Sequence, residues 1–183
     1  MNWQDLPFIE KVHQNQQAFG EKVITIANDL DLLPEWLMCV MNNESGLDST
    51  ARNPYSSATG LIQFMDATAT DLGTTTDELA AMTNIDQLDF VKLYFTKYGY
   101  YKHINDFGDL YLSMLYPLAL YKDDSFMLPD WVTKANPTFD TNKDGHLTKA
   151  EFKENVTAKY ANYLPADNSA EVMALQQKKK LNL

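Results

Sequence analysis

The stretch that decides the fold reads NNESGLDSTARNPYSSATGLIQFMDATA and spans residues 42–69. It follows an apolar run, residues 36–41, and places a polar loop rich in Gly and Ser within a chain otherwise rich in helix formers. A glutamate, Glu44, stands where the apolar run ends. Loops held on a rigid scaffold tend to carry function. This loop and its glutamate are therefore the first candidates for a functional site.

The composition limits the kinds of partner. The chain has 183 residues, of which 45 % are hydrophobic, and a formal net charge of −10. This length suits one domain with at most a small appendage. The acidic balance argues against nucleic acid and anionic lipid as partners. The N-terminus lacks the features of a secretory signal, and no apolar run is long enough to span a membrane. We therefore expect cytoplasmic synthesis without a signal peptide and no membrane insertion.

The spacing of the apolar residues predicts a mainly α fold. Apolar positions recur every three or four residues along most of the chain, which is the period of an amphipathic helix. Residues 60–64, GLIQF, are the one candidate for a short edge strand. Residues 6–30 form one long helix or two consecutive helices in this interpretation, and the other predicted helical segments are 34–41, 66–72, 75–82, 84–98, 109–121 and 149–163.

Glu44 has the setting that a catalytic acid requires. A carboxylic acid can donate a proton near neutral pH only if its pKa is raised, and partial burial at the end of an apolar helix is one way to raise it. Asn43, Ser45 and Gln63 offer neutral hydrogen-bonding groups near it. Such groups suit the hydroxyls and acetamides of a sugar chain. The loop therefore points to a carbohydrate substrate.

Three ordered pieces of the sequence carry a family resemblance. The pair Glu44 and Ser45 is followed by ATGLIQFM at residues 58–65 and by DATA at residues 66–69. In this order and approximate spacing they resemble the soluble lytic transglycosylase family, whose members cleave peptidoglycan and have a lysozyme-like fold. The resemblance covers roughly residues 34–121.

The resemblance implies roles for individual residues. Glu44 corresponds to the catalytic acid, and Ser45, Gln63 and Tyr116 correspond to residues that bind substrate. The implied reaction cleaves the β-1,4 bond between N-acetylmuramic acid and N-acetylglucosamine in the glycan strands of bacterial peptidoglycan. The expected enzyme is a lytic transglycosylase if Glu44 then deprotonates the sugar's own 6-hydroxyl, and a lysozyme if it deprotonates water.

The sequence departs from the family's pattern late in the domain. The family carries a Tyr-Asn pair there, whereas Pro117 follows Tyr116 in this chain. A non-catalytic wall-binding or assembly protein with a lysozyme-like fold is therefore the alternative. A possible second catalytic carboxylate, as ordinary glycosidases use, is not assigned by the sequence; the candidates are Asp48, Asp66 and Asp71.

A second motif, DTNKDGHLTKAE at residues 140–151, matches the calcium loop of an EF-hand. A hard cation requires six to eight oxygen ligands, and short side chains alternate toward it along the loop while a glycine permits the sharp turn. Thr148 and Glu151 also have the spacing of a helix capping box, which is compatible with metal binding. The expected Ca²⁺ ligands are Asp140, Asn142, Asp144, the backbone carbonyl of His146, and Glu151.

The loop is single, so we expect a structural Ca²⁺ site and not a sensor. A small calcium-responsive interaction protein is a further interpretation, but it leaves the loop around Glu44 unexplained. The predicted domains are a lysozyme-like catalytic domain with its N-terminal helices at 1–135, the EF-hand-like loop and its helix at 136–160, and a C-terminal tail at 161–183. The tail is read as a marginal helix or disordered, and its basic run at 176–180 as solvated.

The biological setting follows from these expectations. A short chain without a signal peptide suits a bacteriophage lysis protein or a virion protein, or an injected effector. It would act on the cell wall in the periplasm after lysis-type release, virion delivery or injection. We expect a monomer. The single cysteine, Cys39, lies in the apolar run and is expected to be a buried small hydrophobe.

Overall fold

The computed structural model describes residues 1–166 and 169–181. The described chain is mainly helical and contains isolated β-bridges but no strand, which confirms the predicted mainly α class, whereas the EF-hand-like loop stays a prediction. It divides into two compact units, Met1–Gly99 and Tyr100–Leu183. The predicted boundaries at 135/136 and 160/161 both lie in the second unit, and that division stays a prediction. Within the described residues, no helix combines the length and apolar character needed to cross a membrane.

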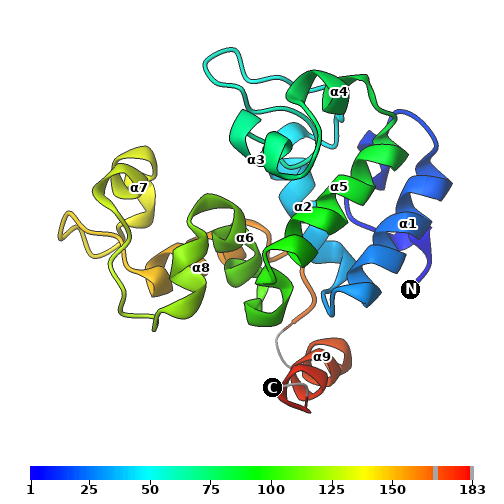
Figure 1. The fold of residues 1–183 in the computed structure, drawn as a ribbon. Coiled ribbons are helices and arrows are strands. Elements are labelled where there is room, and N and C mark those ends of the chain that lie inside the picture. The colour runs from blue at the N-terminus through cyan, green and yellow to red at the C-terminus, as the bar shows by residue number, and fades with distance from the viewer. Residues whose placement is uncertain (167–168, 182–183) are drawn as a thin grey trace. The chain divides into compact units, whose positions relative to one another are not determined.

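The first unit is built around three helices. α1 packs against both α2 and α5, and Figure 1 shows the three as neighbours. Their facing side chains are fully buried and include Phe19, Leu37, Met38 and Phe95. The helices of this unit are α1 (Gln16–Asp29), α2 (Pro34–Ser45), α3 (Asp66–Asp71), α4 (Thr76–Ala81) and α5 (Asn84–Lys97), preceded by the 3₁₀ turns η1 (Trp3–Asp5) and η2 (Ile9–Lys11).

α2 begins where the sequence predicts, at Pro34, but it continues past the predicted end at Met41 to Ser45. Pro34 occupies the first turn, where its missing N–H costs no hydrogen bond. Gly46 ends the helix in the left-handed conformation, φ 65°, and its N–H donates to the carbonyl of Asn42 at 3.0 Å. Glu44 therefore lies in the last turn of a helix whose residues up to Met41 are buried.

Two local expectations are wrong. The segment 6–30 is not continuous helix before Gln16, because Phe8 and Asn15 have positive φ, 63° and 56°, and break the helical path. Residues 60–64 form a turn and not a strand, because Gly60 and Gln63 have φ of 78° and 54°. The apolar side chains of this turn are buried, and a short run of buried apolar residues resembles a strand in the sequence.

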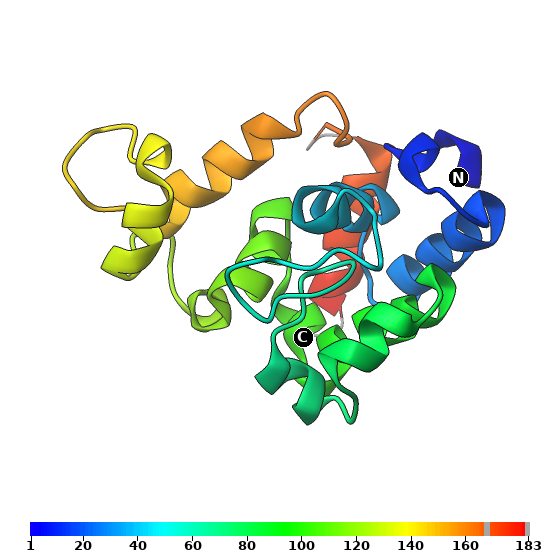
Figure 2. The same ribbon diagram turned by 90° about the horizontal axis from the view of Figure 1, so that it is seen from above.

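The second unit is organised by the contact between α6 and α8, which lie side by side in Figures 1 and 2. Gly108 makes the close approach possible: a Cβ on it would lie 2.6 Å from the Cβ of Lys153. The elements of this unit are η3 (Tyr100–His103), α6 (Phe107–Leu115), η4 (Pro117–Tyr121), α7 (Asp130–Ala135), η5 (Pro137–Phe139), α8 (Lys149–Lys159) and α9 (Ala170–Leu181). The predicted helix 109–121 therefore ends at Leu115, before Tyr116 and Pro117.

A buried charge cluster joins α6 to α8. The Asp109 side chain is 4 % exposed, and the ammonium groups of Lys153 and Lys149 lie 3.0 and 3.6 Å from its Oδ1. Lys153 also pairs with Asp106 at 2.7 Å. Burial and the charge of Asp109 raise the pKa of Asp106. Burial lowers the pKa of Lys153, but the two carboxylates outweigh this and raise it.

The C-terminal segment contains a helix, α9, with Val172 and Leu175 buried. The expectation that residues 176–180 form a wholly solvated basic run is wrong at Lys179, which is 7 % exposed. Its ammonium donates to the carbonyl of Tyr101 at 3.0 Å and also to that of Ile104. Residues 167–168 and 182–183 of the predicted tail lie outside the described residues.

We predict that Lys153→Met destabilises the protein by about 3 kcal/mol, because it leaves the buried Asp109 with one weaker partner, Lys149. The raised pKa of Asp106 means that its uncharged form is favoured by folding, and this contribution is lost as the pH rises. Without the Lys153 ammonium the pKa of Asp106 rises further. The loss of stability caused by Lys153→Met should therefore be larger at about pH 7 than at about pH 4. Urea unfolding at both pH values measures it.

Lys180→Met is the matched control, since Lys180 is exposed on α9. It should change the free energy of unfolding by less than about 0.5 kcal/mol at either pH. An equal effect of the two substitutions would show that the charge cluster does not stabilise the contact between α6 and α8.

Candidate functional site

Glu44 is half-buried in the last turn of α2. The Nδ2 of the neighbouring Asn43 lies 3.4 Å from its Oε1, at the long end of the range for a hydrogen bond. The helix end is fixed by two backbone bonds, from Gly46 to the carbonyl of Asn42 and from Leu47 to that of Met41. The glutamate thus sits on a rigid element at the start of the long loop, as catalytic groups commonly do.

Ser45 connects the end of α2 to the turn at residues 60–63. Its hydroxyl oxygen lies 3.1 Å from the carbonyl oxygen of Met41 and 3.1 Å from that of Leu61. The first contact is within the helix, and the second crosses to the loop. Ser45 therefore has a structural role beside Glu44, and its predicted role in binding substrate stays a prediction.

Gln63 lies in the same turn, in the left-handed conformation. Its amide nitrogen donates to the carbonyl of Gly60 at 3.0 Å and lies 3.5 Å from that of Ala51. The amide nitrogen thus holds the loop together. Among the described residues, no hydrogen bond engages the Gln63 amide oxygen, and its role in substrate binding also stays a prediction.

The turn itself is held by Gln87, a residue of α5 that is completely buried. Its Oε1 accepts a hydrogen bond from the N–H of Leu61 at 2.6 Å. Its Nε2 donates to the carbonyls of Ser49 at 2.9 Å and Leu79 at 2.8 Å. One side chain therefore satisfies backbone groups of three separate segments, which would otherwise be buried without partners.

Gln87 is the site residue that the sequence analysis missed. Its signal was available, because Gln87 interrupts the apolar stripe that Leu88, Val91 and Phe95 form along α5. A polar residue on the buried face of a helix must find hydrogen-bond partners. Its partners are backbone groups, which leave no mark in the sequence.

Tyr116 lies in the second unit, whereas Glu44, Ser45 and Gln63 lie in the first. It is half-buried at the end of α6. Its ring stacks on Phe126, with centroids 6.4 Å apart and planes at 8°, and meets Trp131 edge-on at 6.4 Å. Its predicted role in substrate binding stays a prediction.

The predicted calcium loop is partly organised. Asp140 accepts hydrogen bonds from the N–H groups of Asp144 at 3.2 Å and Gly145 at 2.9 Å, and the Asn142 side chain accepts one from Asp144 at 2.9 Å. Gly145 supplies the sharp turn with φ 85°. Figure 2 shows the loop, in yellow, leading directly into α8. The side chains of Asp140 and Asn142 therefore fold over the backbone of the bend, whereas the Asp144 carboxylate accepts from the N–H of His146 at 2.9 Å.

Glu151 closes the loop at the start of α8. Its Oε2 accepts from the N–H and hydroxyl of Thr148 at 3.0 and 2.8 Å, and this capping box lowers the pKa of Glu151. Its other oxygen, Oε1, is buried with no hydrogen-bond partner among the described residues. A buried carboxylate oxygen without a partner fits a cation ligand. No three His, Cys, Asp or Glu side chains in residues 1–166 and 169–181 are gathered closely enough to hold a metal.

The loop's main chain pairs with a segment earlier in the second unit. The N–H of Leu128 donates to the carbonyl of Leu147 at 2.8 Å, and the N–H of Lys149 donates to that of Phe126 at 2.8 Å. Met127 and Thr148 form an antiparallel bridge between these bonds. The segment 126–128 therefore provides hydrogen-bond partners for the backbone of the loop, a task that a second calcium loop performs in paired EF-hands.

Cys39 is excluded as a nucleophile. It is fully buried on α2, and burial raises the pKa of its thiol to about 12. The thiolate, which is the reactive form, is therefore scarce near neutral pH. This agrees with the expectation of a buried small hydrophobe.

These features define a helical unit in which a glutamate ends a buried helix and a hydrogen-bonded loop follows it. Residues 22–88 match the family model described as the transglycosylase SLT domain. The matched segment contains Glu44, Ser45, Gln63 and Gln87, and ends before Tyr116 and the calcium loop. The match supports the predicted resemblance at the level of the family, whose members are lytic transglycosylases that cleave peptidoglycan. The chain has no match among curated proteins.

We predict that Gly60→Ala destabilises the protein by about 3 kcal/mol, from the strain of a left-handed alanine and from overpacking. A Cβ on Gly60 would lie 2.4 Å from Oε1 of Gln87, whose three hydrogen bonds prevent it from moving away. Gly73→Ala is the matched control, because Gly73 also has positive φ, 82°, but has open space around it.

Gly73→Ala should cost only the backbone strain, about 1 kcal/mol. Thermal unfolding of the two variants separates the cost of the backbone strain from the cost of overpacking against Gln87. Equal losses would show that Gln87 yields to the added methyl group and does not fix the turn.

Proposed function

We propose that this protein degrades peptidoglycan by cleaving the β-1,4 bond between N-acetylmuramic acid and N-acetylglucosamine, with Glu44 as the general acid and then the base. The main support is the position of Glu44: it ends a buried helix inside the segment that matches the transglycosylase family model. The loop that follows Glu44 is held in place by Ser45 and Gln87. A preorganised acid is what proton transfer to a leaving group requires.

In the proposed reaction, the Glu44 carboxyl gives its proton to the glycosidic oxygen as the bond from this oxygen to the muramic acid C1 breaks. The acetamide oxygen of the muramic acid bonds to C1 and takes up the developing positive charge. Glu44, now a carboxylate, removes the proton from the same sugar's 6-hydroxyl, whose oxygen displaces the acetamide from C1. The products are a 1,6-anhydro end and a free 4-hydroxyl, and Glu44 regains its proton.

The local structure favours this single-carboxylate route over a two-carboxylate glycosidase. Asp48 accepts two hydrogen bonds from Thr50 and forms a turn. Asp66 accepts from the hydroxyl of Thr76. The hydroxyl of Tyr98 and the ammonium of Lys97 lower the pKa of Asp71. Each candidate for a second catalytic carboxylate therefore already holds local structure: Asp48 forms a turn, Asp66 bonds to the start of α4, and Asp71 bonds to the end of α5.

A lysozyme-type hydrolase remains the second candidate, since water could replace the 6-hydroxyl as the nucleophile with the same glutamate. A non-catalytic wall-binding or assembly protein is the third, and Pro117 after Tyr116 is the observation that favours it. We further propose a bacteriophage-encoded lysis or virion protein, monomeric, that reaches the wall after lysis, virion delivery or injection.

Calcium is proposed as a structural ion of the second unit. The residues that would hold it are Asp140, Asn142, Asp144, the His146 carbonyl and Glu151, and the unpartnered Oε1 of Glu151 supports this set. Ca²⁺ would supply the positive charge that three carboxylates in one short loop require. Because these side chains are not yet gathered around one point, binding would tighten the loop between the segment 126–128 and α8.

We predict that Glu44→Gln lowers the rate of fragment release from purified peptidoglycan about a thousandfold, because glutamine cannot transfer the proton. Mass spectrometry of the released fragments identifies the reaction. Anhydro ends from the wild type establish the lytic transglycosylase, and reducing ends establish the lysozyme. Absence of fragments from the wild type would support the wall-binding alternative.

Glu10→Gln is the control for this substitution, because Glu10 is exposed in η2. It should release the same fragments as the wild type at an unchanged rate. Wild-type activity in Glu44→Gln would contradict the assignment of the catalytic acid.

We predict that Ca²⁺ raises the melting temperature of the wild type by about 5 °C over its value in chelator. Glu151→Gln should abolish this rise, because the amide retains a capping oxygen but supplies no bidentate carboxylate. Glu154→Gln, an exposed position on the same helix, should retain it. Equal melting temperatures of the wild type with Ca²⁺ and with chelator would refute the proposed site.

A further inference from the structure

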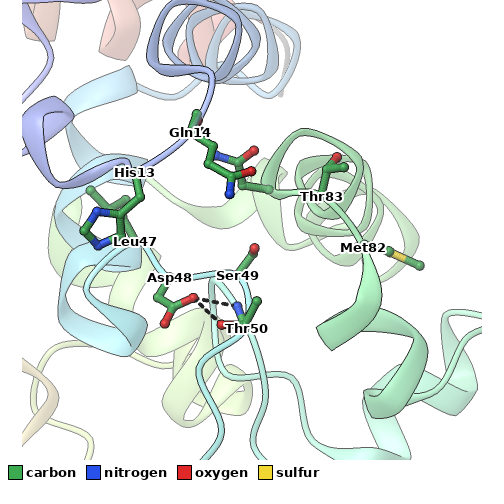
Figure 3. Close-up of a pocket in the computed structure, with 9 residues that line it drawn as sticks. His13, Gln14, Leu47, Asp48, Ser49, Thr50, Met82 and Thr83 are labelled. Atoms are coloured by element: carbon green, nitrogen blue, oxygen red, sulfur yellow. Dashed lines mark hydrogen bonds between the residues drawn. The ribbon is translucent and has the colours of Figure 1, made fainter.

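A pocket of about 320 Å³ opens in the first unit. Figure 3 shows side chains from three stretches of the chain around it: the residues before α1, the residues after α2, and the junction of α4 and α5. Glu44, Ser45 and Gln63 are not among its lining residues, so the pocket does not include the candidate catalytic group. The lining residues are His13, Gln14, Leu47, Asp48, Ser49, Thr50, Met82, Thr83 and Asn84.

Hydrogen bonds between these stretches fix the pocket's walls. The Asn84 side chain donates to the carbonyl of Gln14 at 2.9 Å and joins two walls. Gln87 holds the carbonyl of Ser49 from behind at 2.9 Å. Asp48 Oδ1 accepts from the N–H and hydroxyl of Thr50 at 2.8 and 2.7 Å, as the dashed lines in Figure 3 show. The pocket is therefore formed before any ligand arrives, which lowers the cost of binding.

The backbone beneath the pocket is strained. Leu47 is 3 % exposed and has φ of 67°, a left-handed conformation that costs a bulky residue of the order of 1–2 kcal/mol. It follows Gly46, which has the same conformation. Strained residues of this kind cluster at active sites and ligand clamps. The strain places the Leu47 side chain in the lining and the Asp48 carboxylate directly after it.

The unused polar groups define the chemistry of the ligand. Among the described residues, no hydrogen bond engages the His13 ring, the Gln14 amide, Asp48 Oδ2 or Asn84 Oδ1. Together they offer both donors and acceptors. The lining has one carboxylate and neither Lys nor Arg, so it disfavours anions. Met82, which is half-buried, adds apolar surface. These properties suit a neutral ligand with hydroxyl and acetamide groups and an apolar face.

We infer that this pocket is an accessory saccharide site that binds an N-acetylated sugar of a glycan strand. The inference rests on the proposed function, because a polymeric substrate presents many copies of the same sugar. A second site for the polymer holds the enzyme at an insoluble surface and raises the effective concentration of substrate. A short oligosaccharide that fills only the catalytic site gains nothing from it.

The first test is binding of the tetramer of N-acetylglucosamine to Glu44→Gln, followed by nuclear magnetic resonance. The expected result is a saturable shift of the backbone signals of residues 13–14, 47–50 and 82–84. If these signals do not shift at a saturating concentration of the tetramer, the inference is overturned. Shifts with a free stem peptide and none with the tetramer overturn the saccharide assignment.

The second test compares two substrates in a variant with His13→Ala and Gln14→Ala together. Both side chains are exposed, and the hydrogen bond that Asn84 makes to Gln14 uses the Gln14 backbone carbonyl, which the substitution retains. The rate on insoluble peptidoglycan relative to the rate on a short soluble glycan should fall about tenfold, as expected for losing about two hydrogen bonds. An unchanged ratio overturns the inference.

The control variant carries Gln176→Ala and Gln177→Ala, which are exposed on α9 outside the pocket, and its ratio should equal that of the wild type. Failure of the proposed function has a different signature. If Glu44→Gln cleaves both substrates as fast as the wild type, the proposed catalytic role of Glu44 fails, whereas pocket signals that shift with the tetramer still support the saccharide site.

Discussion

The side-chain amide of Gln87 is the interaction on which the first unit depends. It accepts from Leu61 and donates to Ser49 and Leu79, so it ties α5 to the loop after α2, to the turn at 60–63 and to the end of α4. These backbone groups are buried and would cost about 1–3 kcal/mol each if left without partners. A buried amide with all its partners is rigid, and this rigidity extends to the loop that follows the candidate residue Glu44.

Gln87 also explains the sequence of the loop. Because its amide packs against the backbone at position 60, that position has no room for a Cβ and must be glycine. The N–H of Leu61 is used by Gln87, while the carbonyl of Leu61 faces the hydroxyl of Ser45. A chain of contacts therefore runs from α5 through the turn to the residue next to Glu44. The same amide holds Ser49, which links the loop after α2 to the wall of the pocket.

The second unit uses charge in the same way that the first uses an amide. Asp109 is buried, and Lys149 and Lys153, both on α8, are its cationic neighbours. A buried carboxylate is costly without such partners, so the register of α6 against α8 is specified. Lys149 also donates to the carbonyl of Lys122, which precedes the segment that pairs with the loop. The predicted calcium loop is therefore anchored at its exit by protein contacts alone.

Short-range signals in the sequence predicted the structure well. Pro34 at the start of α2 and the capping boxes at Thr75 and Thr148 each depend on residues within one helical turn, and the structure confirms them. The buried Lys179 was not predictable, because a lysine among lysines resembles a solvated residue until the carbonyls of Tyr101 and Ile104 are placed beside it. The partners of Gln87 were hidden for the same reason, since they are distant backbone groups, although the position of Gln87 on the apolar face of its helix was visible.

The distribution of the candidate residues over two units separates the proposals from one another. The family match, Glu44 and the pocket all lie in Met1–Gly99, whereas the calcium loop and Tyr116 lie in Tyr100–Leu183. The hydrogen bonds that orient Glu44's surroundings close within the first unit, and the ion pairs that anchor the loop close within the second. The family match therefore supports the proposed enzyme activity but not the proposed Ca²⁺ site. Loss of calcium should act on catalysis only if a residue of the second unit, such as Tyr116, takes part in binding the substrate.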